Sequence, residues 1–81
     1  MIVRVRLFAR AKDIAGTDVL SLELAPNAVV ADLRCQLAAQ LPALAALLSR
    51  SAVAVNEEFA HDEQPLTEGA DVALLPPVSG G

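Results

Sequence analysis

The chain has 81 residues, a net charge of −4 and a hydrophobic content of 54%, and these values narrow the possible function classes. A chain of this length forms one domain around a single core, and it is too apolar to remain disordered. Its acidic charge and its two aromatic residues argue against nucleic-acid binding, which uses basic patches and stacking rings. The net charge instead favours a partner whose docking surface is basic.

The apolar stretches are short, and none favours a membrane segment. The longest, around residues 38–48, is interrupted by Gln40 and Pro42 and is shorter than the ~20 residues that a helix needs to cross a bilayer. No secretory signal pattern precedes the first strand pattern, and the single Cys35 cannot form an internal disulfide. We therefore expect a cytoplasmic protein without membrane or nucleic-acid partners.

The first part of the sequence alternates in the manner of two β-strands. Val3, Val5 and Leu7 alternate with polar or outward residues, and a second alternation covers residues 20–24. Residues 9–14 lose the alternation and lead to a turn signal at residues 16–18. This pattern predicts an antiparallel hairpin with a long, partly helical connection.

The period then changes to that of an amphipathic helix. Apolar residues recur at spacings of three and four, at Val30, Leu33, Leu37 and Leu41. Asp32 in the first turn complements the helix dipole. Val29 is a poor N-cap, so the helix either frays at its start or uses Asn27 as its cap. Pro42 ends this helix and opens a second, short one over residues 43–48.

Three further strand segments follow. Residues 52–55 form a short apolar strand, a polar turn at 56–58 leads to a short strand at Phe59, and residues 72–75 form the last strand. The first and last strands are both strongly apolar, so we expect them side by side in mid-sheet, with the main helix covering one face. This order describes an α+β, β-grasp (ubiquitin-like) fold with a mixed sheet of four or five strands. A ferredoxin-like split βαβ fold would need a second long helix.

The C-terminal hexapeptide departs from the rest of the chain, and we expect a β-grasp domain over residues 1–75 with an extended tail over residues 76–81. Glycine leaves its backbone unshielded, so Gly81 is suited to enter a narrow enzyme channel and react there, with Gly80 providing clearance. Two prolines stiffen the stem, and Val78 and Ser79 follow in the threaded segment. A frayed tail is the alternative, but frayed tails are usually polar.

Other reactive groupings are missing from the sequence. It has neither a Ser-His-Asp or Cys-His arrangement nor a Gly-rich phosphate loop after a strand. His61 sits in a charged loop, where a solvated turn is favoured over a metal site. Cys35 lies about 200° around the helix from the core stripe, where we favour a small surface residue over a reactive thiol. We expect no catalytic residues, no metal and no bound cofactor.

Three apolar residues are candidates for a docking patch. Phe8 is out of phase with the inward residues of the first strand and therefore points to the helix-free face, and Leu75 has the same phase on the last strand. Phe59 either joins them there or folds back into a small core, and we favour the first arrangement. The three would then form an apolar patch beside the root of the tail, which is typical of an interaction site.

Several segments together resemble the small, sulfur-carrying subunit of molybdopterin synthase, over essentially the whole chain. They are Leu7-Phe8-Ala9, Gly16-Thr17, Leu33-Arg34, Ala54-Val55-Asn56, Pro65-Leu66-Thr67-Glu68-Gly69, Asp71-Val72-Ala73 and Pro76-Pro77-Val78-Ser79-Gly80-Gly81. The ending Pro-Pro-Val-Ser-Gly-Gly is the most specific of them. The main departures are Leu74-Leu75, where this family often has aromatic residues, and Val29, where a capping Thr is usual.

The resemblance implies a role in molybdenum cofactor biosynthesis. An adenylyltransferase similar to the ubiquitin-activating enzyme would adenylate Gly81 with ATP, and a sulfur donor protein would convert it to a thiocarboxylate. The sulfur would pass to cyclic pyranopterin monophosphate in the large synthase subunit, within a heterotetramer by family analogy. The chain would thus be a non-catalytic, sulfur-donating subunit. The resemblance also implies docking contacts from Phe8, Phe59 and Leu75 and a basic contact from Lys12.

Three other functions stay open at this point. A sulfur carrier for thiazole (thiamine) synthesis has the same fold, although its members tend to be shorter and to lack the Pro-Pro-Val-x-Gly-Gly ending. A ubiquitin-like protein modifier would use the same activated Gly81 and join it to lysines. A plain interaction domain would carry an inert tail.

Overall fold

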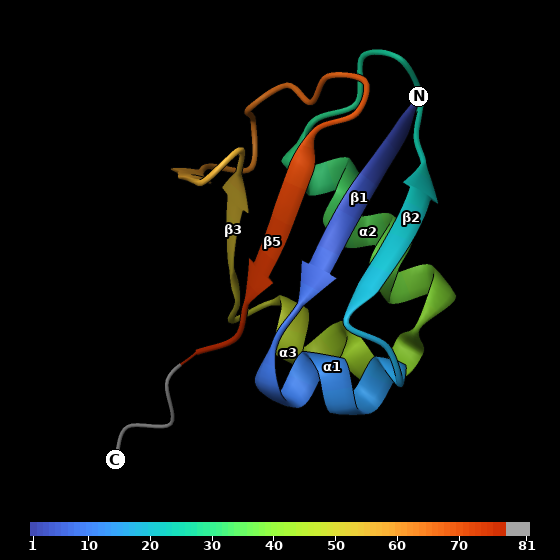
Figure 1. Cartoon of the computed structure of the whole chain (residues 1–81), viewed down its shortest axis with the longest axis vertical. Helices are drawn as coiled ribbons and strands as arrows, with labels where there is room; N and C mark the ends of the chain where they lie inside the picture. The colour runs from blue at the N-terminus through green and yellow to red at the C-terminus, as the bar shows by residue number, and fades with distance from the viewer. Residues whose placement is uncertain (78–81) are drawn as a thin grey trace.

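A computed structural model describes residues 1–77 of the chain, and Figure 1 shows its arrangement. The chain begins with a strand, a helix and a second strand, continues through three helical segments and ends with three strands. The strands are β1 (Ile2–Leu7), β2 (Val19–Glu23), β3 (Ala52–Val55), β4 (Glu58–Ala60) and β5 (Asp71–Leu75). The helices are α1 (Ala9–Ala15), α2 (Val30–Gln40), the short 3₁₀ helix η1 (Pro42–Leu44) and α3 (Ala45–Leu48).

The five strands form one mixed sheet in the order β2-β1-β5-β3-β4. β1 and β5 pair in parallel at its centre, with Val5 opposite Val72 and Leu7 opposite Leu74, and the other strand pairs are antiparallel. The expected central position of the first and last strands is confirmed. The topology is that of a β-grasp fold, as predicted.

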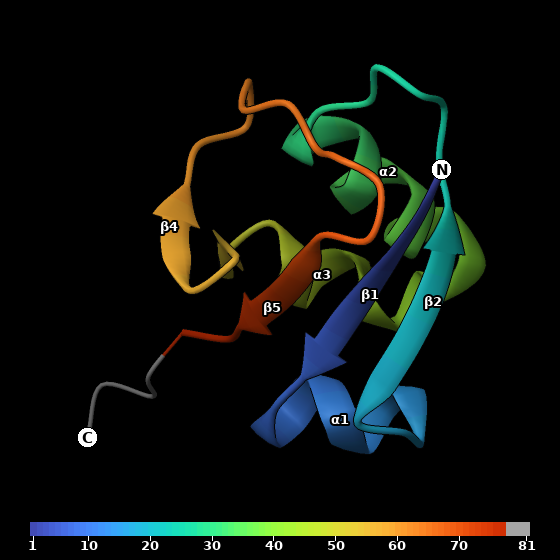
Figure 2. The same cartoon turned by 45° about the horizontal axis from the view of Figure 1, so that its top comes forward.

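The core lies between the sheet and α2, which crosses behind the sheet in the view of Figure 1. The inward residues of the two central strands are fully buried, and so are those of the α2 stripe: Val3, Val5, Leu7, Val72, Leu74, Val30, Leu33 and Leu37. Figure 2 shows α1 across one end of the sheet, where Ala11 is buried and completes the core. Within residues 1–77, no helix covers the opposite face of the sheet.

The start of α2 shows how the chain manages without a standard cap. The helix begins at Val30 with Val29 at the N-cap position, so the proposed use of Asn27 as the cap is wrong. Valine has no side-chain acceptor, and only the reciprocal half of a capping box is made: the Val29 N–H donates to the Asp32 carboxylate at 2.8 Å. Asp32 therefore both complements the dipole and satisfies a free N–H.

The connection between β1 and β2 is more regular than the sequence indicates. α1 fills Ala9–Ala15, and Gly16 ends it with φ 76°, while the Gly16 N–H donates to the Lys12 carbonyl at 2.9 Å. A left-handed glycine is the usual way to end a helix. At its other end Ala9 has φ 50°, a strained value for a residue with a Cβ, so the chain turns sharply immediately after Phe8.

Candidate functional site

The helix-free face of the sheet carries a continuous row of residues across four strands. Strand register places Arg6 opposite Ala73, Ala73 opposite Ala54, and Ala54 opposite Phe59. Leu75 lies two residues beyond Ala73 on β5, and successive even steps along a strand keep to one face. The register therefore brings apolar residues from β3, β4 and β5 together on this face.

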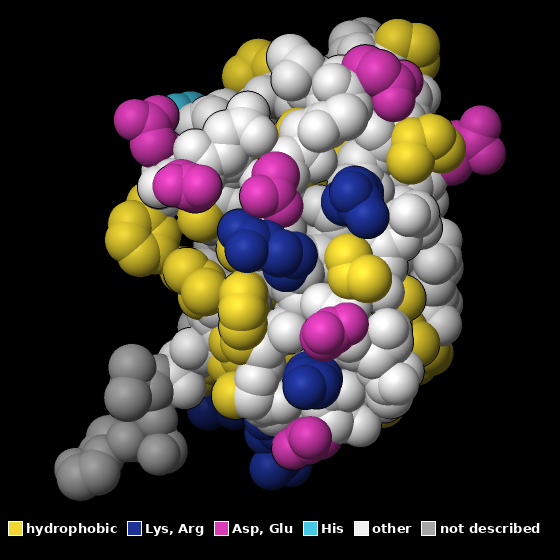
Figure 3. Space-filling view, in the orientation of Figure 1, with side chains coloured by type: hydrophobic (Ala, Val, Ile, Leu, Met, Phe, Trp, Pro, Cys, Tyr) yellow, Lys and Arg dark blue, Asp and Glu magenta, His cyan; other side chains and the backbone are white. Residues whose placement is uncertain are grey.

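We call this surface the outer apolar patch and define it by Phe8, Phe59, Leu75, Ala54 and Ala73. Phe59 is 79% exposed and Phe8 is 41% exposed, whereas Leu75 is half-buried and the two alanines are buried. The alanines form a floor, and the larger side chains stand around it. Figure 3 shows hydrophobic side chains gathered on this face near the point where the chain leaves β5.

Phe8 is positioned by the end of β1 and the start of α1. Its backbone is extended, with φ −128° and ψ 155°, and its carbonyl accepts the N–H of Ala11 at 3.1 Å. The Arg6 guanidinium carbon lies 6.0 Å from the centre of the Phe8 ring, at the outer limit of a cation–π contact. The ring is thus held at the surface and flanked by a positive charge.

Phe59 is positioned by the β3–β4 hairpin, and it does not fold back into a small core. Its two turn residues, Asn56 and Glu57, have φ values of 50° and 72°. The Asn56 N–H donates to the Asp71 carbonyl at 2.7 Å, and the Asp71 N–H donates to Asn56 Oδ1 at 3.0 Å. These two bonds tie the hairpin to β5, so β4 keeps its register and Phe59 stays on the outer face.

The root of the tail lies beside the outer apolar patch. Leu75 pairs with Ala52 at the end of β5, and the chain continues through half-buried Pro76 and exposed Pro77. Lys12 is exposed on α1, the helix that follows Phe8. The proposed threading residues Val78, Ser79 and Gly80 and the proposed reacting residue Gly81 lie outside the described residues.

Charged residues border the patch on the same face. Arg6 Nε lies 3.1 Å from Asp71 Oδ1, and both side chains are about half exposed. The two residues also line an open hollow of about 500 Å³ with Arg4 and Val19. An exposed ion pair adds little to stability, so its main effect is to shape the charge of the face.

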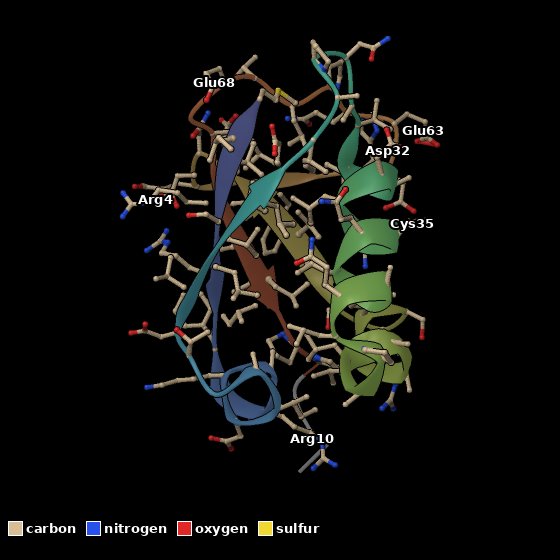
Figure 4. The ribbon with its side chains drawn as sticks, turned by 90° about the vertical axis from the view of Figure 1, so that its right-hand side faces the viewer. Arg4, Arg10, Asp32, Cys35, Glu63 and Glu68 are labelled. Atoms are coloured by element: carbon tan, nitrogen blue, oxygen red, sulfur yellow. The ribbon has the colours of Figure 1, made fainter. Side chains whose placement is uncertain are left out.

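The other candidate reactive groups stay apart from one another. His61 Nδ1 lies 3.3 Å from Glu63 Oε1, but both side chains are largely exposed, and residues 1–77 contain no cluster of three metal-ligating side chains. Cys35 is exposed on the outer side of α2, where Figure 4 shows it pointing away from the sheet. In the part of the chain that the structure describes, no helix is long and apolar enough to cross a bilayer.

The sequence reasoning missed two components of this face. The sequence does not mark Ala54 and Ala73 as part of the site, because a buried alanine in a strand carries no functional signal of its own. The strand register shows that they form the floor of the patch. Arg4 and Arg6 alternate with the inward valines, and this alternation does place them on the helix-free face. The sequence pattern therefore contains the information that Arg4 and Arg6 share a face with Phe8.

Comparisons with known proteins agree with this geometry. The model of the ThiS family matches residues 5–81. The molybdopterin synthase sulfur carrier subunit of Chlamydomonas reinhardtii is 35% identical, over 100% of both chains. Among solved structures, SAMP1 of Haloferax volcanii has a TM-score of 0.89 at 28% identity, over 100% of both chains.

A further solved structure is a complex. One chain of the complex of subunits 1 and 2 of the molybdopterin-converting factor of Helicobacter pylori has a TM-score of 0.72 and 30% identity, again over 100% of both chains. Each of these matches covers the β-grasp domain and continues to the terminal residues. The chain therefore belongs to the ThiS family and is a relative of the molybdopterin synthase sulfur carrier subunits.

Proposed function

We propose that the chain is a sulfur carrier for molybdenum cofactor biosynthesis, with Gly81 as the residue that carries the sulfur. The observation that carries the proposal is the family match, which continues through Gly80 and Gly81. The outer apolar patch supports the proposal, because a partner that binds an exposed patch beside Pro76 could guide the residues after Pro76 into its own active site.

The chemistry begins at the Gly81 carboxylate, which is a poor electrophile. An adenylyltransferase of the ubiquitin-activating type joins a carboxylate oxygen to the α-phosphorus of ATP and releases pyrophosphate. A hydrosulfide equivalent from the sulfur donor then attacks the carbonyl carbon and displaces AMP, which leaves a thiocarboxylate. Gly80 and Gly81 suit these steps because a backbone without side chains admits a close approach.

Transfer to the acceptor takes place in the large synthase subunit. The thiocarboxylate sulfur attacks a carbon of cyclic pyranopterin monophosphate and displaces an oxygen substituent of that carbon, which leaves as a phosphate oxygen or as water, so a carbon–sulfur bond replaces a carbon–oxygen bond. Water then cleaves the resulting thioester, which restores the Gly81 carboxylate and leaves the sulfur on the pyranopterin. Two transfers supply the two sulfurs of the dithiolene. The complex of two converting-factor subunits from Helicobacter pylori supports a large-subunit partner for this chain.

The chain itself docks and directs the sulfur, and the partners supply catalysis. Phe8, Phe59 and Leu75 form the docking contacts, and Lys12 adds a basic contact beside them. Val78 and Ser79 pass through the channel with the glycines. Among residues 1–77 there is no group of three side chains that could hold a metal ion.

The experiment is an intact-mass measurement after incubation with the activating enzyme, ATP and sulfide. The proposal predicts a gain equal to the mass difference between sulfur and oxygen, located in a C-terminal peptide. A variant that lacks Gly81 is the control, and it is expected to show no gain while unfolding at the same urea concentration as the parent. An unchanged mass for the parent chain would refute the carrier role.

A protein modifier is the second candidate, and one observation favours it. The fold is very similar to that of SAMP1, the small archaeal modifier protein 1 of Haloferax volcanii. The same activated Gly81 would then be joined to lysine amines. Peptides with Gly81 in isopeptide linkage, recovered from cells that express the chain, would support the modifier. A carrier for thiazole synthesis would be thiocarboxylated but would not discharge to the pyranopterin.

A further inference from the structure

The charged residues of this acidic protein are unevenly distributed between its two ends. Figure 4 shows Glu63, Glu68 and Asp32 at one end and Arg10 at the other. Seven of the ten acidic residues lie at the same end as Glu63, in loops, turns or the terminal turns of strands and helices. They are Glu23, Asp32, Glu57, Glu58, Asp62, Glu63 and Glu68. Of the basic residues, only Arg34 belongs to that end, where it pairs with Asp62 at 2.9 Å.

The remaining basic residues lie around the root of the tail or on the outer face. Arg10 and Lys12 belong to α1, which follows directly after Phe8. Arg50 lies two residues before Ala52, the β3 partner of Leu75. We call Arg10, Lys12 and Arg50 the basic collar. All three are exposed, and within residues 1–77 none of them lies at ion-pair distance from a carboxylate.

The outer face adds two further basic residues to those of the collar. Arg4 and Arg6 alternate outward along β1, and Asp71 offsets one of them through its ion pair with Arg6. Arg4 makes no ion pair among the described residues, and it lines the open hollow together with Asp18 and Val19. Figure 3 shows Lys and Arg side chains both on this face and at the end that bears the tail.

We propose that the partner surface that receives the tail-bearing end of the chain is acidic, and that the basic collar orients the chain toward it. The inference rests on the proposed function, because it assumes that a partner takes up the tail. The net charge of −4 suggests a basic partner surface, but a docking surface responds to the charges nearest to it. At the tail-bearing end the exposed Arg10, Lys12 and Arg50 outnumber the exposed Asp13 and Asp18, while the strongly acidic end faces away.

Two physical effects follow from this arrangement. Unpaired guanidinium and ammonium groups attract a carboxylate-rich surface over about 8–10 Å at moderate ionic strength, which raises the association rate. The acidic end is repelled by the same surface, so the molecule turns its tail toward the partner before contact. The apolar patch then determines how long the complex lasts, and the collar determines how quickly it forms.

The test measures the association rate of the full chain with the large synthase subunit across a range of salt concentrations. One variant neutralises two collar residues, Arg10→Gln with Arg50→Gln. The matched control, Ala25→Asp with Asn27→Asp, alters the net charge by the same amount in the exposed loop at the opposite end. Urea unfolding of both variants verifies that the fold is retained.

At low salt we expect the collar variant to associate about three- to ten-fold more slowly than the parent, and the control to change by much less. The difference is expected to vanish in about 1 M salt, where charges are screened within ~3 Å. Equal slowing of both variants would show that only net charge matters, and faster association of the collar variant would show a basic partner surface. Either result overturns the inference alone. Failure of the parent chain to bind at all would instead refute the proposed function, and the inference with it.

Discussion

Asn56 and Asp71 hold each other through two hydrogen bonds, one from each backbone N–H, at 2.7 and 3.0 Å. Asp71 uses its carboxylate for Arg6 at the same time, so one residue links the β3–β4 hairpin to β1. The exposed Phe59 depends on this linkage, because it is carried by the short strand that the hairpin holds in place. A polar contact thus determines where the proposed docking residue Phe59 lies.

Replacing Asn56 by Ala is expected to lower the free energy of unfolding by about 1–2 kcal/mol. The change removes the acceptor for the Asp71 N–H and places an ordinary residue at φ 50°, where asparagine is tolerated better. Urea unfolding measures the loss. Asn56→Gly keeps the backbone freedom and removes only the hydrogen bond, so it is expected to cost less than alanine. If the free energy of unfolding of Asn56→Ala equals that of the parent within experimental error, the linkage is contradicted.

Glu57→Gly is expected to stabilise the protein by up to about 1 kcal/mol. Glu57 has φ 72°, which glycine adopts without the strain of a Cβ, and its side chain is exposed. The neighbouring Glu58→Gly removes the same charge from the extended β4, and it is expected to destabilise by about 0.5–1 kcal/mol. In thermal unfolding, a higher melting temperature for Glu57→Gly and a lower one for Glu58→Gly would support backbone strain at Glu57. Equal shifts for the two variants would rule it out.

Arg34→Ala is expected to destabilise the fold by about 1.5–3 kcal/mol. Arg34 Nη1 donates to the Leu48 carbonyl at 2.5 Å and Nε donates to Asp62 at 2.9 Å, so one side chain joins α2 to α3 and to the loop after β4. Arg34→Lys keeps the charge but lacks the two-pronged geometry, and it is expected to recover only a small part of the loss. Full recovery in chemical denaturation would show that charge alone matters.

Phe59→Ser is expected to weaken binding to the large subunit about tenfold or more while changing stability by less than about 0.5 kcal/mol. The ring is 79% exposed, so the folded monomer gains little from it. Phe8→Glu is expected to act in the same way. Ile2→Ser is the matched control, because Ile2 is 44% exposed but lies at the far end of β1. Calorimetric titration measures the affinities, and equal affinity for Phe59→Ser and the parent would remove the patch from the interface.

The sequence predicts the strands and α2 well because their signals are strong and local. The alternations at residues 3–7 and the helical spacing from Val30 follow directly from burial on one face. The sequence starts the helical spacing at Val30, where α2 begins, but it does not predict the cap, which depends on an Asp32 carboxylate that accepts the N–H of Val29. The strained φ of Ala9 also has no local signal, because the surrounding fold imposes it.

For the candidate site, the strand phase of Phe8 and Leu75 is sufficient to place them on the outer face, whereas Phe59 needed the structure to decide between that face and a small core. The alanine floor and the basic collar needed the register and the three-dimensional arrangement, because their members are far apart in the sequence. Gly81 remains an assignment from the family match, and its chemistry is a matter for experiment.

Discharge of sulfur from Gly81 tests the central claim most directly. The thiocarboxylated chain is mixed with the large subunit and cyclic pyranopterin monophosphate, and the intact mass of the chain is followed over time. If the chain is the sulfur carrier, its mass returns to that of the carboxylate only when both components are present, and two chains are discharged for each dithiolene formed. A thiocarboxylate that persists in the complete mixture would contradict this claim.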